Sequence, residues 1–381
     1  GAKSLALATP PVFQRTARKP PDDHWMARAI ALARRGLGRT SPNPAVGAVI
    51  VKGGRVVGEG WHRRAGGPHA EIVALRRAGQ RARGATLYVT LEPCAHYGRT
   101  PPCATAVIAA GLARVVVGVG DPNPRVRGRG FRALEAAGIA VTTGVLAEEA
   151  AAVVAWFRHY IVHGRPYVVL KLAASIDGRI ATARGESRWI SGLAARRWVH
   201  ELRNRVDAVM VGSGTVLADD PALTCRIRGG RDPLRIVVDG RLRTPVRARV
   251  VRQHSTAPTL IATTRSASAA RARALGRAGA EVVVVPGSKT QVSLESLLRM
   301  LAVRGVVSVL IEGGGDLAAA ALRARVVDRL LVVTAPLVIG GDGHPMLGSL
   351  GLGRLAAAPR IIDERITRLG PDLVREGTVA Y

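Results

Sequence analysis

Three potential metal ligands and one carboxylate constrain the fold of this chain more than any other sequence feature. The letters P-H-A-E hold His69 and Glu71, the letters E-P-C end at Cys94, and Cys103 follows after residues 95–102. One imidazole and two thiolates suit zinc, and three protein ligands leave a fourth position for water. The fold must therefore bring His69, Cys94 and Cys103 to one point.

The position of Glu71 indicates catalysis rather than ligation. It follows His69 by two residues, which places a carboxylate beside the metal, where it can take a proton from water and pass it to a departing amine. H-x-E followed by P-C and a further Cys is the signature of zinc nucleobase deaminases. A zinc site without catalysis, or unrelated buried Cys and His residues, are the alternatives. Cys225 is interpreted as an ordinary core or surface residue.

Apolar, β-branched runs alternate with helical patterns and predict two α/β units. In the first unit we expect helices over 22–38, 70–78, 105–110 and 130–137, and strands over 46–51, 55–61, 86–91, 114–119 and 139–143. One helix over 148–163 should follow. The second unit should contain a mostly parallel sheet with strands over 167–172, 208–211, 235–239, 259–262, 281–285, 306–311 and 330–333. The expected division is a flexible tail (1–21), a zinc deaminase domain (22–147), a linker helix (148–165) and a second domain (166–381).

Composition narrows the class of protein. With 381 residues, 48% of them hydrophobic, the chain can build two cores. No apolar run approaches the length of a membrane span, no signal peptide is evident, and three cysteines fit a reducing, cytoplasmic setting. The formal net charge of +29 raises nucleic acid as a partner. However, the basic residues are mostly scattered arginines, which a genome-wide bias explains equally well, and a phosphorylated small molecule would also be attracted.

At the zinc motif the sequence resembles the bifunctional riboflavin-biosynthesis deaminase/reductases. The run P-C-A-H-Y-G-R-T-P-P-C over 93–103 and S-P-N-P-A-V-G over 41–47 are close to the deaminase motifs of that family. The resemblance implies a cytidine-deaminase-like three-layer domain in which Asn43, His62 and His96 contact the substrate. Asn43 could instead be a turn residue before a strand, and the two histidines could be loop residues.

The resemblance continues through the second domain, over 171–179, 186–191, 207–221 and 310–317. It implies an α/β fold similar to dihydrofolate reductase, with NADPH as cofactor. The positions that match cofactor contacts of the family are Ala173, Trp189, Ser191, Thr215, Asp219, Gly314, Gly315, Asp316 and Leu317. Those that match substrate contacts are Lys171, Ser187, Arg203, Leu223, Arg226 and Glu312. A glycine run between a strand and a helix suits a phosphate, as would an arginine clamp formed by Arg203 and Arg226, although both could be plain solvated arginines.

We therefore expect a zinc- and NADPH-dependent enzyme of two successive reactions. The first is hydrolytic deamination of 2,5-diamino-6-(5-phosphoribosylamino)pyrimidin-4(3H)-one. The second is reduction of the ribosyl group of 5-amino-6-(5-phosphoribosylamino)uracil to ribityl. The expected partners are this small-molecule substrate and further copies of the chain in a dimer or tetramer, with no nucleic acid and no membrane. The rival interpretations are a tRNA or single-strand deaminase, which predicts a two-residue spacing between the cysteines, and a zinc-stabilised nucleic-acid-binding protein, which leaves Glu71 unexplained.

Overall fold

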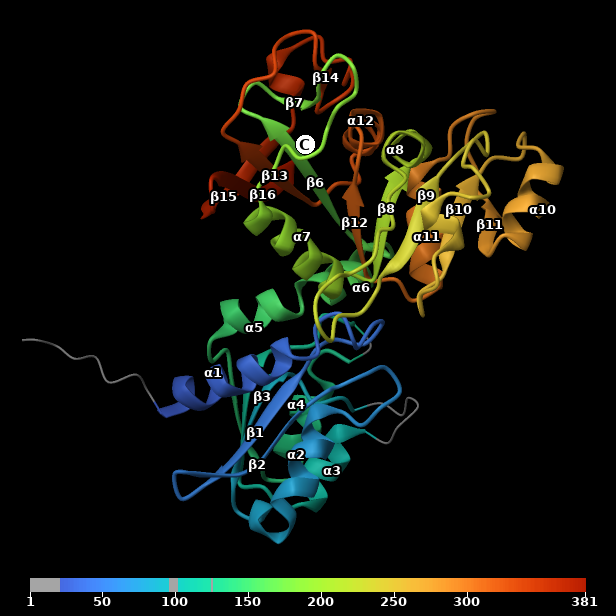
Figure 1. Ribbon diagram of the computed structural model, residues 1–381. Helices are drawn as coiled ribbons and strands as arrows, with labels where there is room; N and C mark the ends of the chain where they lie inside the picture. Colours follow the sequence, from blue (N-terminus) through green and yellow to red (C-terminus); the bar gives the residue numbers. More distant parts are fainter. Residues whose placement is uncertain (1–20, 96–101, 125) are drawn as a thin grey trace, which may run out of the picture.

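A computed structural model describes residues 21–95, 102–124 and 126–381 (Figure 1). Two separate sheets organise the chain, and two short helices, α5 (Ala147–Val153) and α6 (Ala155–His163), lie between them (Figure 1). Within the described residues, no helix combines the length and apolar character needed to cross a bilayer.

The first sheet has five strands in the order β2-β1-β3-β4-β5. Its strands are β1 (Gly47–Lys52), β2 (Arg55–Trp61), β3 (Thr86–Leu91), β4 (Arg114–Val119) and β5 (Ala140–Thr143). β1 pairs antiparallel with β2 and β3, whereas β3, β4 and β5 run parallel. The carboxyl ends of β3 and β4 therefore meet at one edge, where a site in such a sheet is expected.

Helices cover both faces of this sheet and complete the predicted three layers. One face packs on α1 (Pro21–Arg34) and α5, and the other on α2 (Ala70–Ala78), α3 (Cys103–Ala109) and α4 (Arg129–Ala136). Side chains of β1 alternate between these layers, with Val49 facing α1 and Ile50 facing α2. Gly47 lets α1 approach closely, because a Cβ there would lie 2.0 Å from the Ala29 carbonyl oxygen.

The second sheet has nine strands in the order β11-β10-β9-β8-β12-β6-β13-β16-β15. The strands are β6 (Tyr167–Ser175), β8 (Ala208–Gly212), β9 (Leu234–Val238), β10 (Thr259–Thr263), β11 (Ala280–Val284), β12 (Ser308–Glu312), β13 (Arg329–Ala335), β15 (Arg360–Leu369) and β16 (Asp372–Ala380). In this order, the strands from β11 to β13 all pair in parallel with their neighbours. The hairpin of β15 and β16 extends the sheet, with β16 paired antiparallel to β13. The expectation of a mostly parallel sheet is confirmed.

The remaining elements of this unit are mainly helices that cover the two faces of the sheet. They are α7 (Leu193–Arg205), α8 (Ser213–Asp219), α9 (Arg249–Arg252), α10 (Ala269–Arg277), α11 (Leu294–Val303) and α12 (Gly315–Arg323). Two short strands, β7 (Arg179–Ala181) and β14 (His344–Pro345), form a separate two-stranded sheet. Apolar side chains of β12 fill both faces: Ile311 packs on the α11–α12 side and Leu310 on the α9 side.

The structure corrects the expectation of one linker helix. Residues 148–163 form α5 and α6, with a break at Val154. α5 belongs to the first unit, because Ala150 and Val153 are buried in its core with α1. α6 contacts the second unit, where Trp156 stacks on Tyr167 with ring centroids 6.2 Å apart. The two halves of the expected linker therefore pack on different units.

Candidate metal centre and reductase site

The three expected ligands converge at the ends of two helices. His69 is the residue before α2, Cys103 is the first residue of α3, and Cys94 lies in the loop after β3. Their ligand atoms all lie within 4.8 Å of one another. Both helix N-termini point toward the cluster, and their partial positive charge favours thiolates there.

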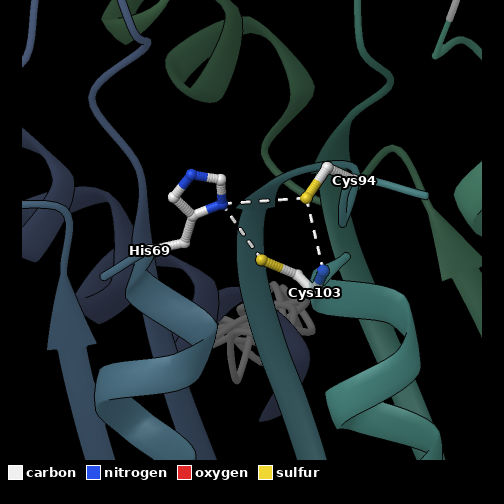
Figure 2. A group of neighbouring side chains, drawn as sticks. All are labelled: His69, Cys94 and Cys103. Carbon is white, nitrogen blue, oxygen red and sulfur yellow. Dashed lines mark hydrogen bonds between the residues drawn. The ribbon is translucent and has the colours of Figure 1, made fainter. Parts of the chain in front are cut away.

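Hydrogen bonds connect the three side chains (Figure 2). His69 Nδ1 lies 3.1 Å from Cys103 Sγ and 3.7 Å from Cys94 Sγ, and the Cys103 backbone N–H donates to Cys94 Sγ over 3.3 Å. The hydrogen bond from the Cys103 side chain, with a further contribution from His69, lowers the pKa of Cys94 to about 4. Cys94 is thus stabilised as a thiolate, the form that binds metals.

This donor set fits a zinc ion of the catalytic type. One imidazole nitrogen and two thiol sulfurs within one contact sphere are the ligands zinc prefers, and three protein ligands are what a catalytic site supplies. His69 turns its Nδ1, rather than Nε2, toward both sulfurs (Figure 2). Among the described residues, no other group of His, Cys, Asp and Glu has comparable metal-binding geometry.

Glu71 lies beside the ligands, on the first turn of α2. It is only 4% exposed, and burial raises the pKa of its carboxyl group to about 7. Its carboxylate also hydrogen-bonds the Cys103 side chain. Both observations place the carboxylate at the metal centre, in the position that the spacing from His69 predicts.

A cavity of about 450 Å³ opens over these residues. His69, Glu71 and Cys94 line its base. Further lining comes from the loops before β1, after β2 and after β4 and from helix α6, through Pro42, Asn43, Pro44, His62, Asp121, Asn123, Phe157, Tyr160 and Ile161 among others. The cavity has the size and the mixed polar and apolar lining of a small-molecule site.

A hydrogen-bond chain orients Asn43 and His62 in this cavity. His62 Nδ1 lies 3.0 Å from the Pro68 carbonyl oxygen, and its Nε2 lies 3.3 Å from Asn43 Nδ2. Because a carbonyl can only accept, Nδ1 carries the proton and Nε2 accepts from the Asn43 amide. Burial lowers the pKa of His62, which favours the same neutral form. The amide oxygen of Asn43 remains available as an acceptor.

The sequence analysis missed part of this cavity. Asp121 and Asn123 follow β4 in the segment D-P-N-P, and polar residues after a buried parallel strand are a signal that could have identified them. Phe157, Tyr160 and Ile161 had no such signal, because helix α6 reaches the cavity only through the packing of the two units. His96, an expected substrate contact, lies outside the described residues.

In the second unit, Lys171, Arg203 and Glu312 form a buried charged cluster. Lys171 in the middle of β6 and Glu312 at the carboxyl end of β12 are direct neighbours in register on two adjacent parallel strands. Arg203 on α7 binds Glu312 with both arms of its guanidinium, at 2.6 and 2.9 Å, and donates to the Thr224 carbonyl at 3.0 Å. Arg203 is therefore engaged with Glu312, in contrast to the expected phosphate clamp with Arg226, which is exposed.

The charges of this cluster compensate one another. Burial alone would raise the pKa of Glu312, but Arg203 and Lys171 hold it below its usual value. Burial lowers the pKa of Lys171, and the charge of Glu312 opposes that shift. An ammonium and a carboxylate are thus presented together at the sheet edge where ligands of open α/β sheets bind.

The glycine turn after β12 is tied to α8. The Gly314 N–H donates to Thr215 Oγ1 over 3.0 Å, and Gly313 has a φ of 134°, in the region that favours glycine. A Cβ at Gly313 would lie 2.7 Å from Thr215 Oγ1. The turn leads into α12, so the residues present suit a phosphate of a dinucleotide at this helix N-terminus.

The other expected reductase residues are placed as follows. The Ser187 hydroxyl donates to Asp219 over 3.3 Å, which brings a substrate and a cofactor position together. Trp189 is 67% exposed and stacks against the Arg196 guanidinium. The Leu223 side chain is 2% exposed in the core, so only its backbone is available to a ligand. Ala173 lies on β6, Ser191 precedes α7, and Gly315, Asp316 and Leu317 form the first turn of α12.

The chain is similar to known proteins over both of its domains. Residues 19–119 match the cytidine and deoxycytidylate deaminase zinc-binding region, and residues 166–375 match the RibD C-terminal domain. The riboflavin biosynthesis protein RibD of Escherichia coli (strain K12) is 45% identical over 366 residues, covering 92% of this chain and 98% of the relative. RibD of Aquifex aeolicus is 41% identical over 354 residues, covering 93% of this chain and 97% of the relative.

Solved structures give the same result at the level of the whole fold. Acinetobacter baumannii RibD superimposes with a TM-score of 0.85 at 39% identity, covering 95% of this chain and 99% of that structure. A Thermotoga maritima protein described as a diaminohydroxyphosphoribosylaminopyrimidine deaminase/5-amino-6-(5-phosphoribosylamino)uracil reductase gives a TM-score of 0.82 at 38% identity, covering 94% and 99%. The chain therefore belongs to the RibD family of riboflavin biosynthesis enzymes, with a zinc-binding deaminase domain followed by a reductase domain.

Proposed function

We propose that this chain catalyses two successive reactions on one phosphoribosylaminopyrimidine skeleton. The deaminase domain converts 2,5-diamino-6-(5-phosphoribosylamino)pyrimidin-4(3H)-one to 5-amino-6-(5-phosphoribosylamino)uracil, and the reductase domain reduces the ribosyl group of that product to ribityl with NADPH. The observation that carries the proposal is the placement of Glu71 beside His69, Cys94 and Cys103 at the base of a cavity.

In the deaminase site, the residues of the chain bind the ring and move protons. Zinc held by His69, Cys94 and Cys103 would supply a Lewis acid that makes water a better nucleophile. Glu71 takes a proton from that water and delivers protons to the 2-amino group. A C–O bond forms at C2, the C–N bond breaks, and ammonia leaves. The amide of Asn43, held by His62, orients the pyrimidine edge.

In the reductase site, the buried cluster positions the ribosyl chain. NADPH, seated on the turn at Gly314 and the start of α12, would supply the hydride for C1′. Lys171 presents N–H donors to ribosyl oxygens, and Glu312 keeps this ammonium charged and in place. Arg203 in turn fixes both carboxylate oxygens of Glu312.

We also infer the setting of the enzyme. The metal-ligand thiols Cys94 and Cys103 require a reducing compartment such as the cytoplasm, and the substrate is a small molecule rather than a nucleic acid. The chain acts as a homo-oligomer, a dimer or tetramer. Sedimentation analysis checks the assembly: a monomer at micromolar concentration contradicts it. Strong retention on a nucleic-acid column at physiological salt contradicts the choice of partner.

A staged assay tests the proposed reactions. The diaminopyrimidine ribotide is supplied first without NADPH, and ammonia is measured; NADPH is then added, and its absorbance is followed. We expect ammonia in the first stage and NADPH oxidation in the second. Glu71→Gln should abolish the first and keep the second when deaminated substrate is supplied. Absence of ammonia from zinc-loaded wild-type protein would refute the substrate assignment.

A further inference from the structure

The loop that carries Asn43 is attached to the reductase domain. Arg39, four residues before Asn43, donates from Nη1 to the Asn204 backbone carbonyl over 3.1 Å and from Nη2 to Asn204 Oδ1 over 3.0 Å. Asn204 lies in the last turn of α7. Gly38 sits so close that a Cβ there would lie 2.6 Å from the Asn204 carbonyl oxygen. The start of the loop thus rests directly on the end of α7.

A second contact holds the middle of the same loop. The Ser41 hydroxyl hydrogen-bonds the carboxylate of Asp207, which follows α7 and is partly buried. The same carboxylate accepts from the backbone N–H groups of Val307 and Ser308 at 2.8 and 3.1 Å, before and at the start of β12. Asp207 is therefore fixed within the reductase domain, and Ser41 is fixed to it.

The contacts at Arg39 and Ser41 end immediately before the cavity. Asn43 closes a turn by donating its backbone N–H to the Thr40 carbonyl over 2.8 Å, and its side chain lines the cavity and donates to His62. The backbone of residues 40–43 is therefore set by a turn, of which one member, Ser41, is attached to the other domain. A displacement of Ser41 moves Asn43 with it.

Helix α6 also lines the cavity and contacts the reductase domain. Phe157, Tyr160 and Ile161 line the cavity. The Tyr160 hydroxyl donates to the carbonyl of Ala302 on α11 over 3.1 Å. Two walls of one deaminase cavity thus depend on how the two domains dock.

We propose that the reductase domain positions two walls of the deaminase cavity, the Asn43 loop through Asn204 and Asp207 and helix α6 through the Ala302 carbonyl. Asn204 and Asp207 are positioning residues for deamination, although both lie outside the deaminase domain. This inference rests on the proposed contact of Asn43 with the pyrimidine. Because misplacement of a binding group by about 1 Å can cost roughly 100-fold in rate, the docking sets the efficiency of the first reaction.

The main test compares two arginine variants of the full-length enzyme. Arg39→Met removes both hydrogen bonds to Asn204. Arg28→Met is the matched control, because Arg28 pairs with Glu59 at 2.7 Å on the surface of the same domain. We expect Arg39→Met to raise the KM for deamination about 10-fold or more, with unchanged zinc content and unchanged reductase activity on deaminated substrate. Equal KM values in the two variants would overturn the proposal.

Conservative substitutions separate positioning from folding. Asn204→Asp keeps an acceptor for Arg39 and for the Arg231 backbone N–H, which bonds the same oxygen at 2.9 Å, whereas Asn204→Ala removes it. We expect Asn204→Ala to raise the deaminase KM less than Arg39→Met does, because its backbone carbonyl still accepts from Arg39 Nη1, and Asn204→Asp to restore the wild-type KM. Ser41→Ala provides a second route to the same loop. An equal fall of both activities in Asn204→Ala and no effect of Ser41→Ala would contradict positioning.

Tyrosine variants test the second wall. Tyr160→Phe keeps the ring and removes only the bond to Ala302, and we expect a several-fold higher deaminase KM. Tyr381→Phe is the control, since its hydroxyl bonds the Val327 backbone within the reductase domain.

Failure of this inference is distinguishable from failure of the proposed function. If Glu71→Gln still deaminates, the proposed function is wrong; if Glu71→Gln is inactive but Arg39→Met matches Arg28→Met, only the inference is wrong.

Discussion

The deaminase and reductase sites differ in what neutralises their buried charged groups. At the deaminase site, His69, Cys94 and Cys103 are close in sequence, and helix N-termini bring their ligand atoms within 4.8 Å. The charge of their thiolates is balanced by a metal. At the reductase site, Lys171 and Glu312 are far apart in sequence but adjacent in strand register, and Glu312 is the counter-charge of both Arg203 and Lys171.

This difference implies that the reacting groups of one site can be lost while those of the other remain intact. Loss of the metal removes the reacting centre of the first site. The second site contains its own counter-charges, so a metal is irrelevant to it, whereas loss of one charged group leaves the others buried and unpaired. The two activities should therefore respond to different perturbations of the same chain.

Removal of a metal ligand gives the largest expected effect. Cys103→Ser should lose bound zinc and with it all measurable deamination, while reduction of deaminated substrate with NADPH stays within about twofold of wild type. The matched control is Cys225→Ser, a cysteine outside the cluster. Zinc stoichiometry and both activities are measured on the same preparations. Retention of zinc and deamination by Cys103→Ser would contradict the dependence of the deaminase site on a metal held by Cys103.

Neutralising the carboxylate of the reductase site should have the opposite effect, with reduction impaired and deamination kept. Glu312→Gln leaves Arg203 and Lys171 without a counter-charge, and we expect reductase kcat/KM to fall roughly 100-fold, or about 3 kcal/mol in activation free energy. Deamination and zinc content should be unchanged. Glu281→Gln is the control, since its pair with Arg304 is exposed. A parallel fall of deamination would show that the two sites are not chemically independent.

Loss of the hydroxyl that holds the glycine turn should have a smaller effect. Thr215→Val leaves the Gly314 N–H without its acceptor, which costs about 1–3 kcal/mol if the group stays unpaired. We expect the KM for NADPH to rise about 5- to 10-fold, with deamination unaffected. Thr90→Val is a matched control, because Thr90 Oγ1 accepts from the Gly47 N–H over 3.2 Å in the deaminase domain. An unchanged KM for NADPH would remove this turn from the cofactor site.

The partly buried His159 on helix α6 should make the free energy of unfolding depend on pH. Burial lowers the pKa of His159 to about 4, against the usual 6.5, with Asp328 opposing and Arg165 and His163 reinforcing this shift. Between these values the unfolded chain binds more protons than the folded one, so the free energy of unfolding falls as pH drops from 6.5 toward 4. The loss is about 3 kcal/mol at most.

Thermal unfolding as a function of pH measures this effect. His159→Phe keeps a ring against Tyr167 and should flatten the fall of Tm below pH 6.5, whereas the exposed His163→Phe should retain it. Identical pH profiles for wild type and His159→Phe would contradict the assignment.

The deaminase centre could be predicted from the sequence because its residues lie close together along the chain. Strand β3 and helix α2 were predicted with the bounds that the structure has, 86–91 and 70–78, and these two elements position Cys94, His69 and Glu71. The ion pair between Arg203 and Glu312 was not predicted, because register between strands and the approach of α7 are set by tertiary packing.

The C-terminal hairpin and the cavity residues on α6 were also not predicted from the sequence. β15 (R-I-I-D-E-R-I-T-R-L) is an exposed edge strand rich in charge, which hides the apolar alternation that identifies buried strands. Tyr160 has no motif around it and gains a place in the deaminase cavity only because α6 docks on α11. Features that depend on the meeting of two domains leave no local trace in sequence.

Complementation between two single-site variants tests the central claim most directly. Glu71→Gln and Glu312→Gln are each incubated with the diaminopyrimidine ribotide and NADPH, alone and as an equimolar mixture, and the ribityl product is measured. Two sites with separate reacting groups predict no product with Glu71→Gln, deaminated intermediate with only traces of product from Glu312→Gln, and full conversion by the mixture. A mixture that stalls at either stage, or a Glu71→Gln variant that forms product alone, would contradict the account.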